Sequence, residues 1–141
     1  MMLYLTWLLL GAALAVLFII IGHRVKFLDF KISMAIGLVV AALIYVGFAL
    51  VWGGPQWVLI EALGIPLYGA MAWLGLRKSP IWIAVGWLLH MPWDLFVHYV
   101  GPGFHVAPEW YIFACFSFDL IVGGYLLILF LQKSPTESIP S

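Results

Sequence analysis

The sequence predicts an all-α integral membrane protein, a polytopic bundle of five transmembrane helices, on three observations. Of its 141 residues, 66% are hydrophobic and only 9% are charged, whereas about a quarter of the residues of soluble proteins are charged. The apolar residues form runs near the roughly 20 residues that a helix needs to cross a bilayer. All six lysines and arginines lie between these runs or after the last one.

The five apolar runs predict helices with recognisable starts and ends. Arg24 follows the first run and no basic residue precedes it, which argues against a cleaved signal peptide. Pro55, Pro80 and Pro108 each open a run, because a proline in the first helical turn leaves no additional donor unpaired. The predicted helices cover residues 3–22, 32–52, 55–76, 80–99 and 108–131, within one domain over 1–133, and residues 134–141 form a predicted disordered tail.

The positions of the basic residues predict the orientation in the membrane. Lysines and arginines follow the first helix, the third helix and the fifth helix, and these three regions share one side of a five-span protein. The positive-inside rule therefore places the N-terminus outside and the C-terminal tail in the cytoplasm. We expect the protein in the cytoplasmic (inner) membrane of a bacterium, with membrane lipids around it.

Composition also limits the classes of partner and function. The formal net charge is zero and no basic tract occurs, so the chain lacks the clustered cations that bind nucleic acid. The single cysteine, Cys115, lies within an apolar run and cannot form an intrachain disulfide. Helices one and two carry no ionisable residue within their spans, and we expect them to act as scaffold. A homo-oligomer or a partner in a membrane complex is compatible with the small size.

The fourth predicted helix carries His90, Asp94 and His98 at intervals of four residues. In an α-helix this spacing places the three side chains in one stripe, roughly 12 Å long. An aspartate in the middle of a membrane costs about 2.5–3.5 kcal/mol even on a lenient insertion scale, and such residues almost always face the bundle interior. From depth alone, Glu61 on the third helix and Asp119 on the fifth are expected to meet this stripe.

Three interpretations of the polar cluster remain open. His90, Asp94, His98 and Asp119 can bind a divalent metal, zinc or iron, because imidazoles and carboxylates are ordinary ligands of both. One ion is not expected to take both histidines unless Pro92 distorts the helix between them. Alternatively, the groups transfer protons without a metal. In the third interpretation they only pair with one another, which contributes about 0.6 kcal/mol per pair and barely offsets their insertion.

The motif H-x-x-W-D-x-x-x-H-Y over residues 90–99, together with Pro108-Glu109-Trp110-Tyr111 and Asp119, resembles a group of small uncharacterised bacterial integral membrane proteins. The resemblance covers mainly the last two helices. The resemblance implies a compact helical bundle in a bacterial inner membrane, and it implies nothing about the reaction.

The interpretation that we favour from the sequence is a membrane-embedded, metal-dependent enzyme acting on a lipid-like or other hydrophobic small molecule. The candidate catalytic residues are His90, Asp94, Asp119 and Glu61, and the candidate pocket residues are Trp93, Phe96, Tyr68 and Cys115. A transporter or conductor of protons or metal ions is the first alternative. An accessory subunit or assembly factor of a larger membrane complex is the second.

Overall fold

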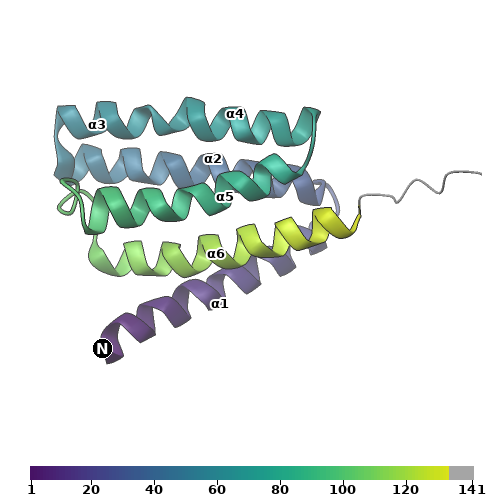
Figure 1. The fold of residues 1–141 in the computed structure, drawn as a ribbon, viewed down its shortest axis with the longest axis horizontal. Helices are drawn as coiled ribbons and strands as arrows, with labels where there is room; N and C mark the ends of the chain where they lie inside the picture. Colours follow the sequence, from purple (N-terminus) through teal and green to yellow (C-terminus); the bar gives the residue numbers. More distant parts are fainter. Residues whose placement is uncertain (134–141) are drawn as a thin grey trace, which may run out of the picture.

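The computed structural model describes residues 1–133, and these form helices joined by short connections (Figure 1). The helical elements are α1 (Met2–Arg24), α2 (Phe30–Phe48), the π-helical turn η1 (Ala49–Gly53), α3 (Pro55–Ala62), α4 (Gly64–Arg77), α5 (Ile81–Trp93), the π-helical turn η2 (Asp94–Tyr99) and α6 (Glu109–Gln132). The predicted all-α class is confirmed. The predicted tail over residues 134–141 lies outside the described residues.

Four helical segments are long and apolar enough to cross a membrane: Met2–Arg24, Phe30–Gly53, Pro55–Arg77 and Glu109–Gln132. Two of them are composite, since η1 extends α2 and α4 follows α3 after a break at Leu63. The fourth predicted span appears as α5 continued by η2, over residues 81–99. Helical segments therefore cover all five predicted runs, with ends within about two residues of the expected positions, and four of these segments are long and apolar enough to span a membrane.

Local sequence explains where these helices begin. The Asp29 side chain caps α2 by accepting a hydrogen bond of 2.8 Å from the backbone N–H of Lys31. Pro55 is the first residue of α3 and follows Gly54, whose φ of 78° favours glycine. Pro108 occupies the position just before α6 and makes no side-chain capping bond, and Glu109 lies in the first turn of the helix.

Two prolines explain where helices are interrupted. Pro66 has no N–H to offer the carbonyl of residue 62, and the helix is broken between α3 and α4, next to Glu61. Pro92 lies inside α5, and the π-helical turn η2 begins two residues later at Asp94. A helix distortion of the kind that Pro92 could supply is therefore present just after this residue, within the motif that carries His90, Asp94 and His98.

The helices pack unevenly. α1 packs mainly along α6 and contacts α2 much less, and its N-terminal end diverges from the other helices in Figure 1. α1 and α6 approach closely where Gly11 contacts the backbone of Ala114. Next to it, the hydroxyl of Ser117 donates a 2.8 Å hydrogen bond to the carbonyl of Leu8. The main apolar core lies among α2, α4, α5 and α6, includes Trp87, and receives Ala15 from α1.

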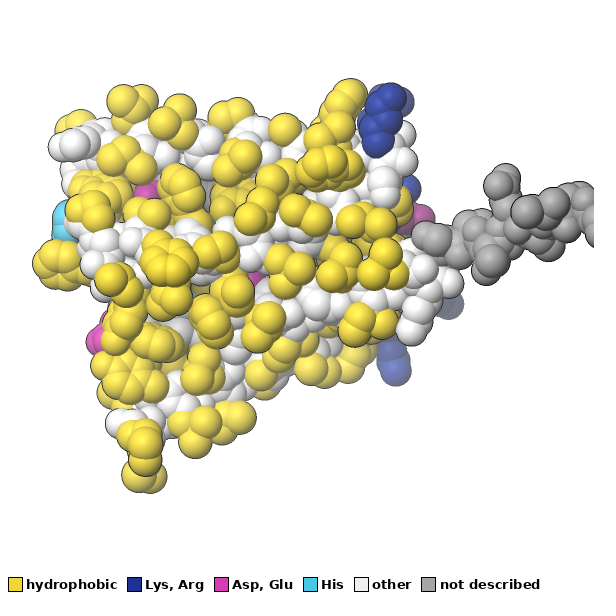
Figure 2. Space-filling view, in the orientation of Figure 1, with side chains coloured by type: hydrophobic (Ala, Val, Ile, Leu, Met, Phe, Trp, Pro, Cys, Tyr) yellow, Lys and Arg dark blue, Asp and Glu magenta, His cyan; other side chains and the backbone are white. Residues whose placement is uncertain are grey.

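Charge is segregated along the bundle. The six lysines and arginines lie at the end where α1, α4 and α6 finish and α2 begins, and Figure 2 shows dark-blue side chains only near that end. Hydrophobic side chains cover most of the visible lateral face. The two π-helical turns and the connection between η2 and α6 lie at the opposite end. A belt of apolar surface thus separates one end that carries the lysines and arginines from an opposite end that has none.

Candidate metal centre

Five histidine and carboxylate side chains are buried among the described residues, each at most 2% exposed: Glu61, His90, Asp94, His98 and Asp119. They come from α3, from α5 with η2, and from α6. The structure therefore brings together, inside the bundle, all of the residues that the sequence predicted to be catalytic or metal-binding. They form two groups, which share the helix α5–η2.

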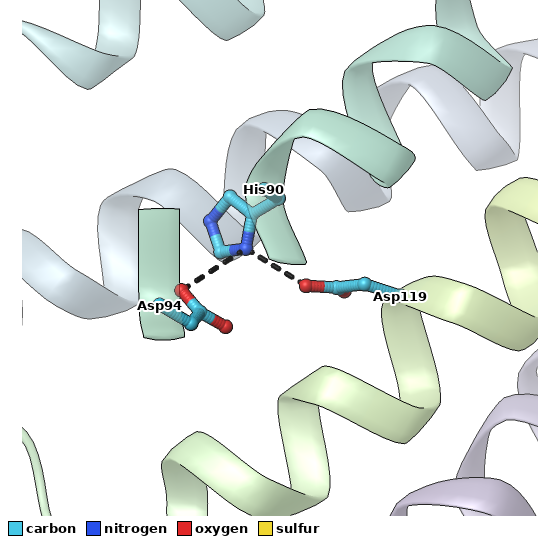
Figure 3. Close-up of side chains that lie close together, drawn as sticks. All are labelled: His90, Asp94 and Asp119. Atoms are coloured by element: carbon cyan, nitrogen blue, oxygen red, sulfur yellow. Dashed lines mark hydrogen bonds and ion pairs between the residues drawn. The ribbon is translucent and has the colours of Figure 1, made fainter. Parts of the chain in front are cut away.

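The first group is His90 with two aspartates (Figure 3). The Nδ1 atom of His90 lies 2.9 Å from Oδ2 of Asp119 and 3.5 Å from Oδ1 of Asp94. Asp94 is one helical turn beyond His90, and Asp119 reaches the same nitrogen from α6. One ligand atom from each of the three residues lies within 4.8 Å of the other two, so these residues could together hold a metal ion.

The second group is Glu61 with His98. Oε1 of Glu61 lies 3.2 Å from Nε2 of His98. The Nδ1–H of His98 donates to the carbonyl oxygen of Gly103 at 3.2 Å, and Nε1–H of Trp93 donates to Oε2 of Glu61 at 3.4 Å. His98 was predicted as a ligand alongside His90 and Asp94, and the structure instead places it beside Glu61.

The π-helical turn helps to keep both histidines on the buried side. In an α-helix with 3.6 residues per turn, a step of four residues overshoots one full turn. In a π-helix the hydrogen bonds run from i to i+5, so the same step falls short of a full turn. Asp94 is therefore displaced around the helix axis in one direction from His90, and His98 is displaced in the opposite direction from Asp94. Both histidines consequently face the same side of the helix, and each is 1% exposed or less.

Aromatic rings surround the two histidines. The ring of Tyr45 stacks on His98 with centroids 4.7 Å apart and an interplanar angle of 22°, and lies 5.5 Å from the ring of His90. The ring of Tyr68 lies 4.9 Å from His90. Tyr45 belongs to α2, which was expected to act only as scaffold. The contacts of this helix with His90 and His98 were therefore not predicted. A buried tyrosine within an otherwise apolar span was the available signal.

The remaining predicted pocket residues divide into two kinds. Trp93 reaches Glu61, and Tyr68 packs on His90. Cys115 lines an apolar crevice together with Asp119. Phe96 is 67% exposed on the outside of the bundle, because two residues after Asp94 the helix presents its opposite side. The structure does not bring Phe96 to the cluster.

The buried polar atoms of this region are incompletely paired. Among residues 1–133, the buried side-chain nitrogen and oxygen atoms without a hydrogen-bond partner belong to Tyr45 (Oη), Glu61 (Oε1), Asp94 (both oxygens) and His98 (Nε2). A buried polar group without a partner costs about 1–3 kcal/mol, and more if it is charged. The concentration of such atoms in one place indicates a site that interacts with something other than the chain itself.

A crevice leads from the side of the bundle to this cluster. A cavity of about 270 Å³ lies between α1 and α2 over α6, and Asp119 is the one charged residue among its lining side chains. Its rim includes Leu14, Val40 and Ile44, which are 38–46% exposed on the lateral surface. The crevice is therefore apolar, open towards the lateral face, and bounded by a member of the His90 group.

The fold and the site together define a class: helical bundles with membrane-spanning character and a buried histidine–carboxylate cluster. The chain belongs to a family of unknown function, DUF6010, whose family model matches residues 6–132. This agrees with the predicted resemblance to an uncharacterised family. No curated protein and no solved structure matches the chain.

Proposed function

We propose that this protein is a metal-dependent enzyme embedded in the cytoplasmic membrane of a bacterium and acting on a lipid-like or other hydrophobic small molecule. One observation carries the proposal: two buried carboxylates, Asp94 and Asp119, converge on one nitrogen of His90. With both carboxylates ionised, one imidazole cannot balance their charge, even when it is protonated. Burying unbalanced charge away from water is costly, and bound cations are an ordinary way to relieve it.

The distances between the donor atoms support a metal in this position. Two ligand atoms bound to one tetrahedral zinc at 2.0–2.1 Å lie about 3.3 Å from each other. The separations of 2.9 and 3.5 Å from His90 Nδ1 to the two aspartates lie on either side of this value. Three protein ligands leave a coordination position open, where a bound divalent metal would polarise a substrate oxygen or lower the pKa of a water molecule.

The apolar crevice supports the class of substrate. Asp119 is the point at which the crevice meets the cluster, so a molecule that enters between α1 and α2 would place its polar end at the proposed metal. The remaining lining residues, such as Leu14, Val40 and Phe118, offer hydrocarbon contacts. A hydrophobic molecule could in this way pass from the lipid to the site without crossing water.

Transport fits the structure less well. A conducted ion would need polar groups from the cluster to the basic end of the bundle. The helices that lead there present Trp87, Ile83, Val122 and Leu126 to the core. The five buried histidine and carboxylate residues all lie nearer the opposite end of the bundle. Chemistry on a molecule that arrives from the lateral crevice needs no such path.

Elemental analysis of the detergent-purified protein, prepared without chelator, tests the proposed metal. We expect at least one equivalent of a divalent transition metal per chain, zinc or iron by the ligand set. Dialysis against a chelator is expected to remove the metal and to lower the temperature of unfolding, because a ligand that binds only the folded state stabilises it. A sample with less than a tenth of an equivalent of every such metal would exclude the metal-dependent function.

The proposed arrangement in the membrane has five spans with the N-terminus outside. In a Cys115→Ala background, a cysteine introduced at His105 is expected to react with a membrane-impermeant maleimide in intact cells. A cysteine at Lys78 is expected to react only after the cells are opened. Both positions are solvent-exposed at opposite ends of the bundle. The reverse pattern of labelling would overturn the orientation.

A further inference from the structure

Glu61 and His98 lie next to each other, and on each side chain one polar atom already takes part in a hydrogen bond with a neighbouring residue. The Nδ1–H of His98 donates to the carbonyl of Gly103, and Oε2 of Glu61 accepts from Trp93. Gly103 leaves room for this contact, because a Cβ there would approach the Trp57 ring to 2.9 Å and Nδ1 of His98 to 3.0 Å. Both side chains are thus oriented by their neighbours, which leaves Nε2 and Oε1 facing each other.

These two facing atoms are close, yet no hydrogen bond joins them. Nε2 and Oε1 are 3.2 Å apart, both are buried, and neither has a hydrogen-bond partner. In the neutral tautomer with hydrogen on Nδ1, Nε2 carries a lone pair and confronts a carboxylate lone pair. Two buried acceptors at this distance repel each other unless a proton on one of them or a metal cation between them balances the two lone pairs.

The same arrangement is typical of a metal-binding histidine. Histidines that bind metals commonly donate the second ring N–H to a backbone carbonyl or a carboxylate, which fixes the tautomer and the ring orientation. His98 has this bond to Gly103, and Tyr45 stacks on its ring. The 3.2 Å separation of Nε2 and Oε1 also agrees with the roughly 3.3 Å expected for two ligands of one tetrahedral ion.

We propose that Glu61 and His98 bind a second divalent cation, through Oε1 and Nε2, next to the centre formed by His90, Asp94 and Asp119. The role of this cation in a reaction rests on the proposed function, whereas its binding does not. The two positions are separate, because the ligand atoms of Glu61 and His98 do not join the compact group around His90.

Two neighbouring cations would give the site the character of a two-metal enzyme. His90 and His98 lie on one continuous helix, and the ring of Tyr45 contacts both histidines. Asp94, whose two oxygens accept no hydrogen bond, lies between the two histidines in that helix. A pair of metal ions can hold a substrate oxygen and an attacking or leaving oxygen together, as in metal-assisted hydrolysis. A hydrophobic molecule carrying an ester or phosphoester group is the class of substrate that this arrangement suits.

Metal stoichiometry tests the second position. The purified protein is stripped with chelator, dialysed against Zn²⁺ and then against metal-free buffer, and analysed for zinc. We expect two equivalents per chain in the wild type and one in Glu61→Gln, since the amide keeps the shape of the side chain and removes its charge. His98→Gln is a second variant with the same expected result. Glu109→Gln and His105→Gln are matched controls at exposed positions of the same end of the bundle, and both should retain two equivalents.

The outcomes separate this proposal from the proposed function. One equivalent in the wild type that persists in Glu61→Gln would overturn the second position and leave the His90 centre intact. One equivalent that is lost in both Glu61→Gln and His90→Ala would indicate a single shared ion and would also overturn it. No bound zinc in the wild type would overturn both proposals. If Glu61→Gln does not fold, the His98→Gln variant and the wild-type stoichiometry still decide.

Discussion

Gly11→Val is expected to separate α1 from the rest of the bundle. A side chain at position 11 would overlap the backbone carbonyl of Ala114 and the hydroxyl of Ser117 in α6. The backbone cannot yield as a flexible side chain would, so the helices must move apart. α1 packs mainly on α6, and its other contacts, such as Phe18 with Trp87 and His23 with Phe30, lie in its C-terminal half. We expect a loss of about 1–3 kcal/mol or more in the free energy of unfolding.

Thermal unfolding in detergent, followed by circular dichroism, measures this loss, and proteolysis of the connection after α1 reports the detachment of the helix. Gly124→Val is the matched control, because apart from the adjacent backbone of α6 itself no atom lies within 4 Å of an added Cβ at that position. Equal unfolding temperatures for Gly11→Val and the wild type would contradict the close packing of α1 against α6 at this position.

His90→Ala is expected to abolish metal binding at the first centre. The imidazole is the one nitrogen ligand of that centre, and its nitrogen lies between the two aspartates. Without it, two buried carboxylates remain next to each other without a positive or hydrogen-bonding partner. We expect a loss of at least 100-fold in metal affinity and about 3–5 kcal/mol in stability, the cost of breaking a buried charged pair.

Titration of the chelator-treated variant with Zn²⁺ measures the affinity, and thermal unfolding measures the stability. His23→Ala is the matched control, since His23 is a solvent-exposed histidine that pairs with the hydroxyl of Tyr125 at the basic end of the bundle. Unchanged zinc affinity in His90→Ala would place any bound metal elsewhere in the protein.

The helices were predictable from the sequence because apolar runs and first-turn prolines determine where spans begin and end. The run over residues 3–22 appears as Met2–Arg24, and the run from Pro108 appears as Glu109–Gln132. The π-helical turns were not predictable in detail. Pro92 indicated a distortion, but widening into η2 depends on how the following turn packs against neighbouring helices.

The residues of the site could be predicted from the sequence, because burying a charged group in a membrane is energetically costly. Which of these residues contact one another could not be predicted. Depth along the helices placed Glu61, Asp94 and Asp119 near one another. Which carboxylate meets which histidine depends on helix rotation, which the break at Leu63 and the turn η2 alter. Tyr45 was missed because its signal, one hydroxyl within an otherwise apolar span, is weaker than that of a charged side chain, although this hydroxyl is buried without a hydrogen-bond partner.

X-ray absorption spectroscopy at the edge of the bound metal in the wild-type protein tests the central claim most directly. The claim is that buried histidine and carboxylate side chains hold a metal at the end of a hydrophobic crevice. The predicted spectrum shows a first shell of nitrogen and oxygen atoms at 2.0–2.2 Å, with the outer-shell scattering of imidazole. A first shell without imidazole, or one containing the sulfur of Cys115, would contradict the account.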